Sequence, residues 1–255
     1  MKILFLGDIV GKKGREVIRD LLSSLKEQYK PDFVIANGEN AAHGKGITYK
    51  LYNELISYGI DAITMGNHTY SKKEIFNDIE SMDKLIVPNN INEKVGEGYR
   101  VFTVQNTKVC VVNLLGQALM GEYMSDPFTS YKEVLDNTNA DIYFVDFHAE
   151  ATAEKRLFLE YFKENVDVVV GTHTHVQTAD EDILYDNVAF ISDVGMCGPY
   201  YSIIGRNIDE SINSYIYKEK THYETCDSDP ILCAVLIEFN SINKPIDIKR
   251  IQIRP

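Results

Sequence analysis

Long apolar runs, an excess of basic residues and paired cysteines are all absent from this chain of 255 residues. No apolar run approaches the roughly 18 residues that cross a bilayer, and the first residues lack the cleavage site of a signal peptide, so we expect neither feature. The 26 lysines and arginines against 38 aspartates and glutamates give a net charge of −12. This balance argues against a coat protein for nucleic acid and against attachment to an anionic membrane, because both need a basic surface.

Cysteine is too scarce and too scattered for a disulfide framework. The four cysteines form no Cys-x-x-Cys pair, and Cys110 and Cys233 lie inside apolar runs. We therefore expect reduced thiols and a cytoplasmic protein. The chain also lacks internal repeats and linkers rich in proline, serine or glycine, so we expect one domain over residues 1–255.

The arrangement of apolar residues predicts an α/β fold. Short runs rich in β-branched residues predict strands at 2–6, 33–37, 60–65, 108–114, 141–147, 166–171, 188–192, 231–239 and 246–253. Helical spacing recurs at 17–25, 52–56, 75–79 and 157–162, the third after the capping-box sequence Ser71-Lys72-Lys73-Glu74. This alternation predicts parallel strands with helices outside. The runs from Val188 onward have fewer helices between them and suggest a mixed or second sheet.

Side chains that can bind metals follow five of the predicted strands. In chain order these side chains are Asp8, Glu39, Asn40, Asn67, His68, His148, His173 and His175. One aspartate after a strand is usually a helix cap, and one histidine there is usually a hydrogen-bonded surface residue. Five coincident strand ends are harder to explain in that way. Because parallel strands share the edge formed by their carboxyl ends, we expect these groups to meet in one cleft.

The chemistry of these side chains favours two metal ions. The set offers imidazole, carboxylate and amide groups but no thiolate, which suits manganese, iron or zinc in a site that is not structural. These candidates exceed the four ligands that one tetrahedral ion needs, whereas two ions that share a bridging carboxylate would use seven. Two metals about 3.5–4 Å apart are the usual device for in-line attack on phosphorus. We expect two divalent ions, with iron or manganese as the first choice and zinc as the alternative.

Six motifs resemble those of the calcineurin-like metallophosphoesterases and, within them, the YmdB-like bacterial 2′,3′-cyclic nucleotide phosphodiesterases. They lie at residues 7–11, 36–44, 66–69, 146–150, 169–178 and 192–196. The chain departs from that branch at Tyr70-Ser71, where Trp-Asp is common, and this difference touches no metal ligand. The resemblance implies a four-layer α/β/β/α sandwich of two mixed sheets, which agrees with the run of later strands.

The resemblance also implies a role for each candidate side chain. One ion would be held by Asp8, Glu39, Asn40 and His175. The other ion would be held by Glu39, Asn67, His148 and His173. A hydroxide that bridges the ions would attack phosphorus in line, and His68 would protonate the leaving ribose oxygen as general acid. Two ions, two carboxylates and the hydroxide leave a local charge of about +1, which suits a phosphodiester monoanion.

Two other functions fit the same residues. One is a phosphomonoesterase or protein phosphatase with the same metals, and the other is a non-catalytic regulator that binds a nucleotide or an RNA end. The intact ligand set and His68 favour an enzyme with a small phosphodiester substrate, because a pure binder needs no leaving-group acid. The resemblance also suggests self-association as a homo-oligomer.

Several residues near the motifs have two interpretations each. His43 and Lys45 fit either substrate contact or an ordinary loop, and residues 193–199 suggest a loop near the cleft. Asp146 and Glu150 fit either the orientation of a ligand imidazole or a structural role: a buried hydrogen-bond partner for Asp146 and a helix N-terminal charge for Glu150.

Overall fold

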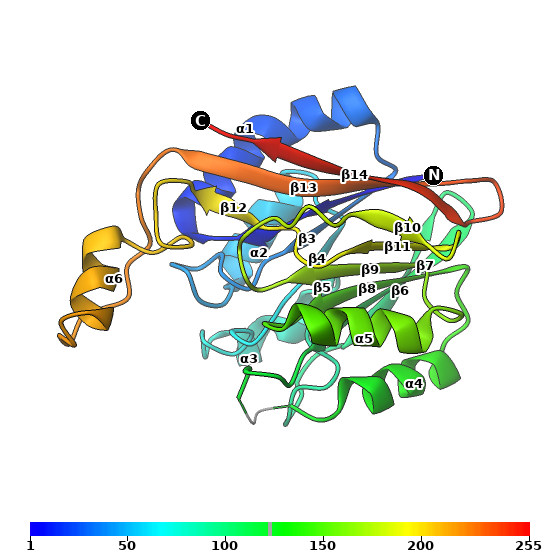
Figure 1. The fold of residues 1–255 in the computed structure, drawn as a ribbon, viewed down its shortest axis with the longest axis horizontal. Coiled ribbons are helices and arrows are strands. Elements are labelled where there is room, and N and C mark those ends of the chain that lie inside the picture. Colours follow the sequence, from blue (N-terminus) through cyan, green and yellow to red (C-terminus); the bar gives the residue numbers. More distant parts are fainter. Residues whose placement is uncertain (122–123) are drawn as a thin grey trace.

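The computed structural model describes residues 1–121 and 124–255 as a sandwich of two β-sheets with helices on both outer faces (Figure 1). The first sheet has the strand order β2-β12-β13-β1-β3-β4-β5, with β14 beside β13. The second sheet has the order β10-β11-β9-β8-β7-β6. The expected four-layer α/β/β/α sandwich of two mixed sheets is confirmed.

The first sheet combines parallel strands from the first third of the chain with strands from its last quarter. Its members are β1 (Lys2–Leu6), β2 (Asp8–Ile9), β3 (Phe33–Asn37), β4 (Ala62–Thr64), β5 (Leu85–Ile86), β12 (Met196–Pro199), β13 (Pro230–Phe239) and β14 (Pro245–Ile253). β1, β3, β4 and β5 run parallel, whereas β13 pairs antiparallel with both β1 and β14. The sequence suggested a loop at residues 196–199, but these residues form the buried strand β12.

The second sheet begins much earlier in the chain than the sequence suggested. Its members are β6 (Tyr99–Val104), β7 (Thr107–Leu115), β8 (Ile142–His148), β9 (Val168–Thr172), β10 (Asp182–Leu184) and β11 (Val188–Ile191). The runs from Val188 onward suggested a mixed or second sheet. β13 and β14 make the first sheet mixed, because β13 pairs antiparallel with β1 and β14, and of these runs only β11 belongs to the second sheet. Both faces of β13 are buried, so its hydrophobic pattern does not reveal its pairing partner.

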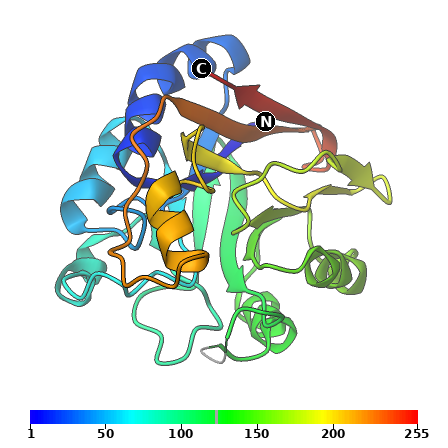
Figure 2. The ribbon, with the colours of Figure 1, turned by 60° about the vertical axis from the view of Figure 1, so that its left-hand side comes forward.

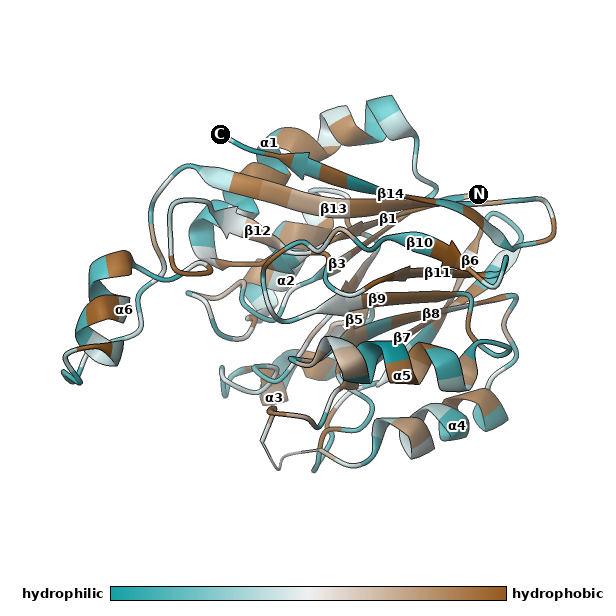
Figure 3. Ribbon diagram, viewed as in Figure 1, coloured by the Kyte–Doolittle hydropathy of each residue, from teal (hydrophilic) through white to brown (hydrophobic). Residues whose placement is uncertain are grey.

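Each sheet is covered on its outer face by two helices. α1 (Gly11–Tyr29) and α2 (Tyr49–Ser57) pack on the first sheet, whereas α4 (Pro127–Asn137) and α5 (Thr152–Phe162) pack on the second. A third apolar layer lies between the sheets, where the Phe5 and Phe144 rings stack with centroids 5.6 Å apart. Figure 3 shows mainly hydrophobic strands and helices of mixed character, as this layering requires.

Two shorter helices complete the fold. α6 (Ile208–Tyr215) stands apart from the sheets at one end of the sandwich (Figure 1 and Figure 2). α3 (Ile75–Asp78) is followed by a 3₁₀ turn over Ile79–Ser81, and Ile75 of α3 packs into the outer apolar layer of the first sheet. Among the described residues, no helix has both the length and the apolar composition that crossing a bilayer requires.

The capping box expected at Ser71 does not form. α3 begins only at Ile75, and Glu74 precedes it without a side-chain cap. The Ser71 N–H instead donates to the carbonyl oxygen of His68 at 3.0 Å. The residues between β4 and α3, which include Asn67 and His68, form turns. The helix therefore starts later than its sequence signal predicts.

A buried lysine supports the loop that carries two of the candidate ligands. Lys155 on α5 is fully buried, and its Nζ donates to the Thr172 carbonyl oxygen at 2.9 Å and to Asp193 Oδ2 at 3.1 Å. Asp193 also accepts hydrogen bonds from the backbone N–H groups of Thr174 and Gly195. The ion pair thereby ties α5 to the residues just after β9.

Replacing Lys155 by methionine should lower the free energy of unfolding by about 3–5 kcal/mol. The substitution keeps the length of the side chain but leaves the Asp193 carboxylate buried without its cation. Urea unfolding followed by circular dichroism measures this change. Lys50→Met, at an exposed position on α2, is the control and should change the free energy by no more than about 0.5 kcal/mol. Equal effects of the two substitutions would contradict the structural role of the ion pair.

Candidate metal centre

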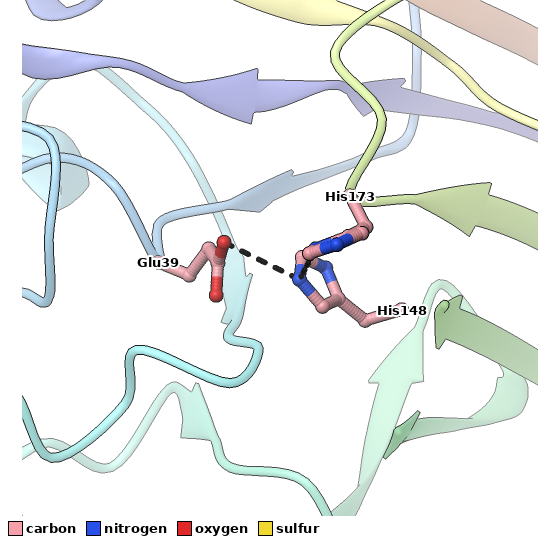
Figure 4. A group of neighbouring side chains, drawn as sticks. All are labelled: Glu39, His148 and His173. Carbon is pink, nitrogen blue, oxygen red and sulfur yellow. Dashed lines mark hydrogen bonds and ion pairs between the residues drawn. The ribbon is translucent and has the colours of Figure 1, made fainter. Parts of the chain in front are cut away.

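The polar side chains that follow five strands meet between the two sheets. They come from the ends of β1, β3 and β4 in the first sheet and of β8 and β9 in the second. Figure 4 shows Glu39 reaching from the loop after β3 toward His148 and His173. The side chains thus share one site, as expected, but they converge across the sandwich rather than along one sheet edge.

One group of side chains surrounds the Nε2 atom of His148. Glu39 Oε1 lies 3.3 Å from this nitrogen, Asn67 Oδ1 lies 3.0 Å from it, and His173 Nδ1 lies 3.1 Å from it. His148 itself is fully buried. Electron pairs that converge so closely repel one another unless a proton or a cation lies between them.

The orientation of His148 is fixed from behind by a buried network. Its Nδ1 lies 2.8 Å from Thr172 Oγ1, and that hydroxyl donates to Asp146 Oδ1 at 2.7 Å. Thr172 therefore accepts the Nδ1 proton of His148 and leaves Nε2 to face the cluster. Asp146 also accepts from Asn37 Nδ2 at 2.9 Å and Thr64 Oγ1 at 2.5 Å. Asp146 is thus a buried hydrogen-bond partner, and its link to the His148 ring runs through the Thr172 hydroxyl.

His173 is oriented by the exposed carboxylate of Glu150. Glu150 Oε2 lies 3.1 Å from His173 Nε2, and the Nδ1 atom of the same ring lies 3.1 Å from His148 Nε2. A proton on Nε2 of His173 therefore faces Glu150, and the electron pair of Nδ1 faces the cluster. This contact supports the interpretation of Glu150 as a residue that orients an imidazole.

A second group combines Asp8, Glu39 and His175 within 4.8 Å. His175 Nδ1 donates to the Ile204 carbonyl oxygen at 2.8 Å, so its Nε2 faces Asp8 Oδ1 at 3.9 Å. Asn40 joins this group through Nδ2, which lies 3.0 Å from His175 Nε2 and donates to Glu39 Oε1 at 2.9 Å. Glu39 is therefore common to both groups.

Asp8 carries the clearest sign that a cation fits here. Its Oδ2 accepts a hydrogen bond from the His173 backbone N–H at 3.2 Å, but its Oδ1 is buried without any hydrogen-bond partner. An unpaired buried carboxylate oxygen is costly, and buried carboxylates are normally paired or coordinate a metal. The donor set of carboxylate, amide and imidazole groups suits a divalent transition metal.

Gly66 allows the Asn67-His68 turn to pass close to the cluster. A Cβ atom at this position would overlap Glu39 Oε2 and lie 2.5 Å from His148 Nε2, so any larger residue would displace these two side chains. The His68 backbone N–H donates to the same Glu39 oxygen at 3.1 Å. The turn after β4 is thus docked on the carboxylate that both groups share.

Without a bound cation, the crowded charges shift the pKa values of the cluster. Burial raises the pKa of Asp8 to about 7, although His175 and His148 act against the shift. Burial alone would lower the pKa of His148, but the Glu39 and Asp8 carboxylates raise this pKa to about 9. Burial and the neighbouring His148 lower the pKa of His173 to about 3. His148 therefore carries a proton at neutral pH until a cation displaces it.

Loading of metal-stripped protein with Mn²⁺ at about pH 7 should release protons and should weaken as the pH is lowered. The pKa of His148 is about 9, so its proton is bound below that pH and must leave before Nε2 can take a cation. Titration calorimetry in buffers with different ionisation enthalpies measures the number of protons released. A heat of binding that is independent of the buffer, with one affinity between about pH 7 and 9, would contradict this expectation.

His68 lies at the boundary between two cavities beside the cluster. Burial lowers the pKa of its imidazole below 6.5. One cavity, of about 250 Å³, is lined by His68 together with the cluster residues Glu39, Asn40, His173 and His175. The other, of about 630 Å³, is lined on this side by Asn67 and His68. The His68 imidazole can therefore contact a ligand bound in either cavity.

The segment between β12 and β13 adds residues that the sequence did not single out. Ile204, Arg206 and Tyr223 line the smaller cavity, and the Ile204 carbonyl orients His175. The Arg206 guanidinium lies 4.8 Å from the centroid of the Tyr223 ring, and Lys45 Nζ lies 5.0 Å from the same centroid. Lys45 thus contacts an aromatic ring at the site. His43 is exposed and does not line either cavity.

The four-layer fold, with a cluster of potential metal ligands between its two sheets, is typical of the metallophosphoesterases. A model of the YmdB-like protein family matches residues 4–251, and the chain belongs to this family. The resemblance noted in the sequence is therefore confirmed.

Individual relatives resemble almost the whole chain. The 2′,3′-cyclic-nucleotide 2′-phosphodiesterase of Bacillus subtilis (strain 168) is 42% identical over 257 residues, which cover 99% of this chain and 97% of the relative. The crystal structure of a novel phosphatase from Mycoplasma pneumoniae has a TM-score of 0.94 at 38% identity, covering 99% of this chain and 93% of that chain. A hypothetical protein from Thermus thermophilus has a TM-score of 0.93 at 31% identity, covering 99% of both chains.

Proposed function

We propose that this protein is a metal-dependent phosphodiesterase that hydrolyses 2′,3′-cyclic nucleotides. The observation that carries the proposal is the convergence of two groups of potential ligands on Glu39, beside the unpaired Oδ1 atom of Asp8. The name of the Bacillus subtilis relative, at 42% identity, supports this choice of substrate.

Seven side chains would hold two divalent cations. Asp8, Glu39, Asn40 and His175 would hold one cation, and Glu39, Asn67, His148 and His173 would hold the other. In this structure Asn40 Nδ2 faces the cluster. Because cations bind the oxygen of an amide, the Asn40 side-chain amide would have to rotate so that its oxygen and nitrogen exchange places. When bound, two such ions act as Lewis acids on phosphate oxygens and lower the pKa of water to about 7.

The protein's own groups would then orient the ligands and move a proton. Thr172 and Asp146 hold the Nδ1 proton of His148 away from the cluster, and the Ile204 carbonyl does the same for His175. His68, beside Glu39, is the group that would donate a proton to the leaving ribose oxygen. Iron or manganese is the proposed metal, with zinc as the alternative.

A panel of substrates tests this proposal on protein loaded with manganese or iron. We expect hydrolysis of 2′,3′-cyclic AMP, loss of activity after chelation, and about two metal ions per chain by elemental analysis. Faster hydrolysis of AMP or a phosphopeptide would instead favour the phosphomonoesterase or protein phosphatase alternative. Binding of cyclic nucleotide or an RNA end without turnover by metal-loaded protein would favour the regulator and overturn the proposal. Self-association stays a prediction of the resemblance.

A further inference from the structure

The larger cavity beside the cluster has one polar wall and a mainly apolar remainder. It measures about 630 Å³, and Asn67 and His68 form the wall that faces the cluster. Apolar and aromatic side chains line much of the rest: Tyr70, Ile91, Leu115, Met120 and Met124. The volume falls within the range of about 300–1,000 Å³ that is typical of sites for small molecules.

Hydrogen bonds hold the walls of this cavity in place. The Tyr70 hydroxyl donates to the Val95 carbonyl oxygen and accepts from the Val95 N–H, both at 2.8 Å. The buried Asn90 side chain donates to the carbonyl oxygens of Leu115 and Ser125 at 2.8 and 2.9 Å, and it accepts from the Leu115 N–H at 2.8 Å. The cavity is therefore built from segments that are fixed to one another before a ligand enters.

We propose that this cavity binds the nucleoside part of the substrate, namely the ribose and its base. The inference rests on the proposed function, in which the oxygen that receives the proton of His68 belongs to ribose. That ribose must then lie against His68, and the base must extend away from the cluster. The smaller cavity holds about 250 Å³ beside the cluster and is below the usual range for a small-molecule site. The larger cavity has the room that a nucleoside needs.

The charge and the chemistry of the lining agree with an uncharged aromatic ligand. Apart from His68, Glu93 is the only acidic or basic residue among the described residues that line the cavity, and no described lysine or arginine lines it. A second phosphate would therefore find no cation there. The Tyr70 ring is fixed, stacking on Phe76 with centroids 5.0 Å apart, and the methionines offer polarizable surface. Such walls suit the face of a nucleobase.

Two substrates with the same reacting atoms separate this inference from the proposed function. 2′,3′-Cyclic AMP carries the base, and methyl ribofuranoside 2′,3′-cyclic phosphate lacks it. We expect the wild-type protein to hydrolyse both but to prefer cyclic AMP by at least about 10-fold in kcat/KM, which corresponds to about 1.4 kcal/mol of binding to the base. Equal values would overturn the inference and leave the function intact, whereas hydrolysis of neither would overturn the function.

Filling the cavity from its rim tests the same inference in the protein. Ser71 is exposed and lines the cavity, so Ser71→Trp places a large ring there without disturbing the core. We expect kcat/KM for cyclic AMP, and for an oligonucleotide that ends in a 2′,3′-cyclic phosphate, to fall at least about 10-fold, because both present a terminal nucleoside. The value for the abasic substrate, which keeps the ribose but lacks the base, should fall by a clearly smaller factor.

Ser23→Trp, at an exposed position on α1 that lines neither cavity, is the matched control and should change no substrate. Adenosine alone should inhibit hydrolysis of the abasic substrate competitively, and Ser71→Trp should raise its inhibition constant at least about 10-fold. A parallel loss of rate on all substrates in Ser71→Trp, or an unchanged inhibition constant, would place the nucleoside elsewhere.

Discussion

Replacing His68 by alanine should leave the metal content unchanged and lower kcat for 2′,3′-cyclic AMP by about 10²–10⁴-fold. The contact of this residue with the cluster is its backbone N–H bond to Glu39 Oε2, and alanine keeps that bond. The substitution therefore removes the imidazole at the boundary of the two cavities and leaves the ligands in place. Elemental analysis and steady-state kinetics on the same preparation measure the two effects.

The exposed histidine His43 provides the control for this experiment. It lies near the site in sequence but lines neither cavity, so His43→Ala should retain wild-type turnover. Full activity in His68→Ala would remove the role of proton donor. Loss of metal from His68→Ala would show that the ring acts on the cluster rather than on the substrate.

Replacing Glu39 by alanine should remove nearly all bound metal, whereas His175→Ala should retain about one of two ions. Glu39 belongs to both groups of potential ligands, but His175 belongs only to the group that contains Asp8. Without Glu39, each group also loses a carboxylate that stabilises positive charge. Metal content of protein purified and dialysed in the same way, together with kcat, measures the difference.

Glu16→Ala, on the surface of α1 outside both cavities, is the control and should retain about two ions. Equal metal contents in Glu39→Ala and His175→Ala would argue against a carboxylate shared between the ions. Retention of both ions in Glu39→Ala would overturn the centre as described.

The candidate ligands could be predicted because each one follows a strand that is visible in the local sequence. Asp8, Glu39, Asn67, His148 and His173 all come directly after runs of buried residues, and the strands carry them to the same place. The division of those strands between two sheets could not be predicted in this way. Pairing depends on contacts between distant segments, and a strand buried on both faces, such as β13, fits either sheet by its composition.

Other residues of the site gave no local signal. Ile204 and Arg206 lie in a segment without clear helix or strand periodicity, and their role depends on where that segment folds back. Lys155 reads as an ordinary polar residue of a helix, and only its tertiary contacts with Asp193 and Thr172 explain its burial. Tertiary contact thus determines the residues that orient the ligands, although the ligands themselves follow from local pattern.

The pairing of β1 with β13 has a consequence for the newly made polypeptide. Lys2 lies opposite Glu238 in this pairing, so β1 gains both of its neighbours only after the ribosome has added residues 230–239. The Gly7 N–H, next to Asp8, likewise donates to the Cys233 carbonyl oxygen at 3.0 Å. A chain halted before β13 would therefore keep one edge of β1 open to other strands, a known cause of aggregation, and would leave Asp8 without the backbone support beside it.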